Sequence, residues 1–131
     1  MKTQHLGKQP VVLTPQFAAV SKGFSGTFYQ ELDSEFDGFK GHLLISHHEF
    51  DTPWGVWEMH PKGDEVVCLL SGDIDFVLRT ADGERTLRIN EPGSYVIVPK
   101  GTWHTANPHE PTSLLFITPG EGTENREQPA L

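Results

Sequence analysis

Apolar and polar residues alternate with a period of two along most of the chain. In residues 73–80, "DIDFVLRT", isoleucine, phenylalanine and leucine take every second position, as in a strand with one buried face. Asp82 and Gly83 follow as a turn, and Leu87 and Ile89 then resume the alternation. This pattern predicts a β-hairpin.

The same alternation predicts further strands along the chain. They are expected at residues 26–32, 39–50, 54–60, 65–70, 95–99 and 112–118. No stretch of helical length keeps an apolar repeat of 3.6 residues, so at most one helical turn is expected, near the N-terminus. Many short strands separated by Gly- and Pro-containing turns are typical of a sandwich or barrel. The chain is therefore predicted to be all-β.

Length and composition fit a single domain over residues 1–131. The one cysteine, Cys68, has no partner for an internal disulfide, which suits a reducing compartment. The first residues carry no apolar core of signal-peptide length, and no apolar run is long enough to span a bilayer. We therefore expect a cytoplasmic protein. The polar segment 119–131 is expected to be a flexible tail.

The net charge excludes some classes of partner. The chain has 18 acidic and 10 basic residues, for a formal charge of −8. Such a balance repels a phosphate backbone and an anionic membrane surface. Neither nucleic acid nor a membrane is therefore expected as a partner.

Potential metal ligands gather in two places. In "WEMHPKGDEVVCLLSG", Glu58 and His60 lie two residues apart and so share one face of a strand. Asp64 and Glu65 are adjacent, so only one of them can point inward, and the pleat alone does not choose between them. In "GSYVIVPKGTWHTANP", His104 begins a strand after a tight reversal. Two histidines and one carboxylate on rigid strands could form a facial triad for a metal ion, whereas the simpler alternative is two strands and a solvated turn.

These two clusters resemble the paired motifs of the cupin superfamily, over roughly residues 40–118. His60, Glu65 and Gly72 match the first motif, and Gly93, Pro99, Gly101 and His104 match the second at the family's intervals. The resemblance selects Glu65 over Asp64. It implies a jelly-roll barrel (a double-stranded β-helix) of two antiparallel sheets, and a divalent ion held by His60, Glu65 and His104.

The sequence departs from the family at Glu58, which stands where cupins have their first histidine. Glu58 could be a fourth ligand or a general base beside the ion. Alternatively, it bonds a neighbouring side chain and the metal is lost, as in some cupins. A site with two carboxylates favours iron, manganese or zinc over copper.

The resemblance implies three possible functions. The first is a dioxygenase-like, metal-dependent enzyme that acts on a small organic molecule. The alternatives are a Lewis-acid metal isomerase and a non-catalytic binding or sensing protein. Small domains similar to this one commonly dimerise through a sheet face, so a homodimer is expected. Either His47 or His48 would face the barrel interior, depending on how residues 39–50 pair with residues 54–60.

Overall fold

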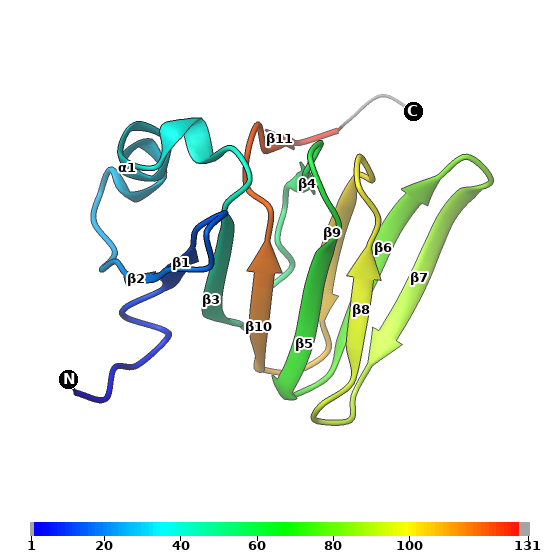
Figure 1. The fold of residues 1–131 in the computed structure, drawn as a ribbon. Coiled ribbons are helices and arrows are strands. Elements are labelled where there is room, and N and C mark those ends of the chain that lie inside the picture. Colours follow the sequence, from blue (N-terminus) through cyan, green and yellow to red (C-terminus); the bar gives the residue numbers. More distant parts are fainter. Residues whose placement is uncertain (1, 129–131) are drawn as a thin grey trace.

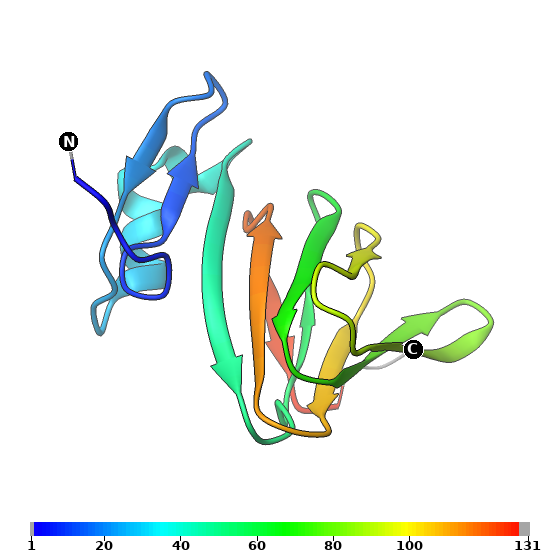
Figure 2. The same cartoon turned by 90° about the horizontal axis from the view of Figure 1, so that it is seen from below.

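The structure, a computed structural model, describes residues 2–128, which form two antiparallel sheets (Figures 1 and 2). The six-stranded sheet has the order β2 (Ala19–Ser21), β1 (Val11–Leu13), β3 (Leu43–Phe50), β10 (Thr112–Thr118), β5 (Glu65–Ser71), β8 (Tyr95–Val98). The five-stranded sheet has the order β11 (Glu124–Arg126), β4 (Trp57–Met59), β9 (His104–Pro108), β6 (Ile74–Thr80), β7 (Gly83–Ile89). The predicted all-β architecture of two antiparallel sheets is confirmed.

The main core lies between the two sheets and follows the alternation seen in the sequence. Inward residues of β5, β8 and β10 meet inward residues of β6, β7 and β9. The cluster comprises Val67, Leu69, Ile74, Phe76, Leu78, Ile89, Val96, Val98, Ala106, Leu114 and Phe116, all at most 7% exposed. Burial of these side chains fixes the register of both sheets, because a slip of one residue would turn them outward.

Two glycines set the connections around this core. Gly72 has φ +106°, and a Cβ there would lie 2.5 Å from Thr112 Oγ1 and 2.6 Å from the Pro111 carbonyl oxygen. Only glycine fits this turn between β5 and β6. The β6–β7 hairpin turns at Ala81 and Asp82, one residue earlier than predicted, and Gly83 opens β7.

The strand predicted at residues 26–32 is wrong. This segment lies largely in helix α1 (Phe28–Glu35), which the short 3₁₀ helix η1 (Asp37–Phe39) follows. Phe28 and Leu32, four residues apart, are buried in a second core cluster with Val12, Phe39 and Leu44. Two residues that precede α1 donate hydrogen bonds to Glu31 within it: Lys22 Nζ at 2.8 Å and Ser25 Oγ at 2.6 Å. These bonds hold the helix in place. Two apolar residues are too few to show a helical period in the sequence.

The expected pairing of residues 39–50 with residues 54–60 is also wrong. Strand β3 pairs with β1 and β10, and not with β4. Its inward face is set by Leu44 and Ser46, which are buried, and His48 follows in the same alternation. His48 therefore faces the interior, while His47 contacts Ser113 on the outer face.

Part of the segment 119–131, which is expected to be a flexible tail, forms a strand. Within it, β11 pairs antiparallel with β4, matching Asn125 to Glu58. Residues 129–131 lie outside the described residues. Among residues 2–128, no helix is long and apolar enough to cross a membrane.

Candidate metal centre

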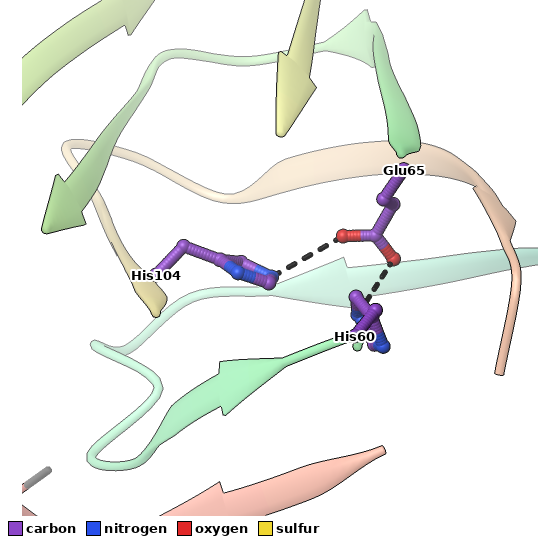
Figure 3. A group of neighbouring side chains, drawn as sticks. All are labelled: His60, Glu65 and His104. Atoms are coloured by element: carbon purple, nitrogen blue, oxygen red, sulfur yellow. Dashed lines mark ion pairs between the residues drawn. The ribbon is translucent and has the colours of Figure 1, made fainter. Parts of the chain in front are cut away.

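His60, Glu65 and His104 come together at one end of the two sheets (Figure 3). His60 follows the last residue of β4, Glu65 opens β5 and His104 opens β9. Gly101 N–H donates to the His60 carbonyl oxygen at 2.9 Å, and Lys100 N–H donates to Asp64 Oδ1 at 2.7 Å. These two bonds join the loop before β5 to the loop before β9. They bring the two sequence motifs together and give Asp64 a structural role.

The three side chains are almost completely removed from solvent. His60, Glu65 and His104 are 5%, 3% and 0% exposed. One potential ligand atom from each lies within 4.8 Å of the other two. His60 Nε2 lies 3.3 Å from Glu65 Oε2, and His104 Nε2 lies 3.2 Å from Glu65 Oε1. The predicted ligand set is thus assembled in space.

Nδ1 of each imidazole carries a proton and donates it in a hydrogen bond. The Thr123 hydroxyl donates to the Gly120 carbonyl oxygen at 2.9 Å, so Thr123 Oγ1 accepts from His60 Nδ1–H at 2.8 Å. His104 Nδ1–H donates to the Thr102 carbonyl oxygen at 3.0 Å. A neutral imidazole with a proton on Nδ1 presents a bare lone pair at Nε2. In the neutral imidazoles these lone pairs point toward the Glu65 carboxylate, whereas in a protonated imidazole Nε2–H points toward it.

His60 Nε2, His104 Nε2 and the Glu65 carboxylate converge, and with both imidazoles neutral no donor lies between them. Of the buried side-chain polar atoms described, His60 Nε2, His104 Nε2 and Glu65 Oε1 are among the few without a hydrogen-bond partner. Unpaired buried polar atoms are costly, and each normally has an explanation such as an ion. Two imidazole nitrogens and a carboxylate are donors that iron, manganese and zinc accept. The residues present therefore fit a divalent ion.

Charge within the cluster favours the ionised carboxylate. Burial raises the pKa of Glu65, but the contacts with His104 and His60 outweigh it and bring that pKa down to about 2. Burial lowers the pKa of His104, and the neighbouring Glu65 carboxylate more than reverses this, so the net shift is upward. The carboxylate thus demands a cation beside it, which either protonated imidazole or a metal ion supplies.

Several solved structures share this architecture, although no protein-family model and no curated protein sequence matches the chain. A cupin-2 domain containing protein from Shewanella frigidimarina is 21% identical, with a TM-score of 0.51 over 59% of this chain and 70% of that one. Oxalate decarboxylase from Bacillus subtilis, a protein with Mn(II) centres, is 19% identical, with a TM-score of 0.52 over 63% of this chain and 23% of that one. Hydroquinone 1,2-dioxygenase from Sphingomonas is 16% identical, with a TM-score of 0.50 over 58% of each chain.

The protein has the cupin fold. The jelly-roll barrel expected from the two motifs is confirmed. At these identities the likeness concerns the fold alone, so activity and ligands have to be argued from the residues of this chain.

Glu58 lies beside this cluster but is not one of its three converging residues. It pairs directly with His104 across β4 and β9, so the two side chains lie on the same face. Burial raises the pKa of Glu58, and Glu65 raises it further. His104 and His60 lower it, but the net shift is upward. Its role as a fourth ligand or as a general base stays a prediction.

A cavity of about 740 Å³ opens beside the cluster. Glu58, His60 and Glu65 line it from the two sheets, and His48 lines it from β3. Helix α1 and η1 contribute to its wall, so the N-terminal segment helps to enclose it. This volume suits a small organic ligand.

Two threonines that sequence reasoning missed support the cluster. Thr118 Oγ1 donates to Glu65 Oε2 at 2.6 Å, and Thr123 Oγ1 accepts from His60. Thr123 lies in the segment expected to be a flexible tail. No signal in one sequence marks these residues, because each acts through a single hydrogen bond with a residue more than 50 positions away.

Thr123→Val is expected to lower the affinity for the metal roughly 10- to 100-fold, because loss of the bond to Nδ1 frees the His60 ring and its tautomer. The protein should remain folded. Equilibrium titration with zinc against a competing chelator measures the change, and Thr86→Val, on β7, is the matched control. Equal zinc affinity in Thr123→Val and in the wild type would contradict this role.

Proposed function

We propose that this protein binds one divalent ion through His60, Glu65 and His104 and acts as a dioxygenase-like enzyme on a small organic molecule. The observation that carries the proposal is the convergence of two buried imidazole Nε2 atoms and one carboxylate, without other hydrogen-bond partners for the two nitrogens, beside a cavity. Three protein ligands leave coordination positions open, as metal-dependent oxygenases require. The proposed ion is iron, manganese or zinc.

The chain's own residues would do the remaining work. When bound, the ion would supply sites for substrate and O₂ and would polarise the substrate. Thr123 and Thr102 hold the two imidazoles in one tautomer, and Thr118 orients the carboxylate. Glu58 borders the cavity on the same face as His104 and would accept a proton from a bound substrate.

Oxygen consumption by reconstituted protein tests this function. Protein loaded with Fe(II) or Mn(II) is incubated with a library of small organic molecules, and O₂ uptake is followed with an electrode. We expect uptake with at least one compound, and none with His104→Ala. Metal binding without O₂ uptake for any compound would remove the oxygenase proposal and favour a Lewis-acid isomerase or a binding protein.

We further propose that the protein is a homodimer. The outer face of β5 and β8 carries a contiguous apolar patch, in which Leu70, Tyr95 and Ile97 are 43%, 62% and 51% exposed. A patch of this kind on a sheet face is typical of a surface that a second copy covers.

Light scattering coupled to size exclusion is expected to give the mass of a dimer for the wild type and of a monomer for Ile97→Glu. Val20→Glu, an equally apolar exposed position on β2, is the matched control and should stay dimeric. A monomeric wild type at micromolar concentration would contradict the homodimer. A monomeric Val20→Glu beside a dimeric Ile97→Glu would place the interface elsewhere.

A further inference from the structure

The cavity beside the candidate metal centre has an unbalanced set of charged groups. Its acidic lining residues are Asp33 at the rim, Glu58 on β4 and Glu65 on β5. Among the described residues that line it, none is lysine or arginine. Burial lowers the pKa of His48, and His47 lowers it further, so both effects favour the neutral imidazole.

The walls of the cavity are aromatic. The Trp54 ring centroid lies 5.4 Å from that of Phe50 and 6.1 Å from that of Phe116, and all three residues line the space. Phe39, from η1, contributes a further aromatic side chain. Such walls favour a flat apolar body over a small, strongly hydrated ligand.

These two features disfavour an anionic ligand. An anion that leaves water must find a cationic or hydrogen-bonding partner, and here its nearest charged neighbours outside the ion would be carboxylates. Glu65 would offset one of the two positive charges of the ion, and Glu58 lies beside the ion's position as a second acidic residue. The chain's net charge of −8 adds a long-range repulsion of anions.

We propose that the cavity selects small aromatic molecules that carry no negative charge, and that it discriminates against carboxylates. This inference rests on the proposed function, because the selected molecule is the substrate of the same metal centre. A neutral or cationic aromatic ligand leaves no charge unpaired, and a cation is further stabilised by the aromatic faces and by Asp33.

A series of ligands matched in size and different in charge tests the proposal. Benzylamine, benzyl alcohol and benzoate share one ring and carry positive, zero and negative charge at neutral pH. Their dissociation constants are measured by ligand-observed NMR on the zinc-loaded protein, after elemental analysis has established the zinc content. We expect the amine and the alcohol to bind at least about 10-fold more tightly than benzoate.

Two variants assign the discrimination to the cavity's acids. In Asp33→Asn/Glu58→Gln the gap between benzyl alcohol and benzoate should shrink to roughly threefold or less, because the repelling carboxylates are gone. Asp82→Asn, at the exposed β6–β7 turn, is the control and should keep the wild-type gap. An unchanged gap in the double variant would overturn the proposal.

Other outcomes separate the inference from the proposed function. Benzoate binding as tightly as benzyl alcohol overturns the inference, even if zinc is bound stoichiometrically and the metal site stands. Failure to bind zinc overturns the metal site, and the same order of affinities measured on the metal-free protein still tests the cavity. Absence of binding for all three ligands below about 10 mM overturns the inference as well.

Discussion

Replacing His104 with alanine is expected to give a folded protein that purifies without stoichiometric metal. His104 is completely buried, and its Nε2 is one of the three converging potential ligand atoms. The two remaining ligands cannot fix the geometry of an ion by themselves, so most of the affinity is lost. His60→Ala should behave in the same way.

Elemental analysis of the purified variants, with circular dichroism to establish folding, measures this effect. Glu65→Gln should also bind metal more weakly, because an amide replaces the charged carboxylate. Asp64→Asn is the matched control: the asparagine oxygen can still accept from Lys100 N–H, and Asp64 lies outside the cluster. Wild-type metal content in both histidine variants would mean that the ion binds elsewhere.

Zinc at about 1,000 times its dissociation constant is expected to stabilise the wild type by about 4 kcal/mol. For a domain of this size, that gain corresponds to a rise in Tm of roughly 10–20 °C. The physical reason is that the ion binds the folded cluster and not the unfolded chain, in which the three residues are far apart.

Differential scanning calorimetry with and without zinc measures this shift. In His60→Ala the shift should disappear, whereas His109→Ala, which removes a half-exposed histidine that pairs with Asp75, should keep it. A wild-type Tm that does not respond to zinc would show that folding creates no metal site. An equal shift in His60→Ala would show that zinc acts through other residues.

The parts of the fold that the sequence predicts are those in which neighbours along the chain are also neighbours in space. The β6–β7 hairpin is of this kind, because its turn and its alternation are local. The partner of β3 is not local: β10 lies more than 60 residues away along the chain. One sequence does not reveal that pairing, so it does not determine which of His47 and His48 faces the interior.

In the candidate site, too, the sequence predicts the residues within the two motifs but not the support that comes from distant segments. His60, Glu65 and His104 follow from the spacing of two motifs, because strands, turns and their glycines fix where the side chains point. The supporting bond from Thr123 depends on how β11 docks on β4, in a segment whose composition predicts a mobile chain. Helix α1 escaped prediction because its burial depends on a separate cluster with β1 and β3, and not on its own period.

We expect His60, Glu65 and His104 to hold one divalent ion. A crystal structure of zinc-loaded protein, with diffraction data recorded on both sides of the zinc absorption edge, tests it most directly. We expect one anomalous peak about 2.0–2.2 Å from His60 Nε2, His104 Nε2 and a Glu65 carboxylate oxygen. The distance from this peak to Glu58 decides whether that residue is a fourth ligand. If protein crystallised with excess zinc shows no peak at this cluster, or a peak only at other residues, these three residues do not form the metal site.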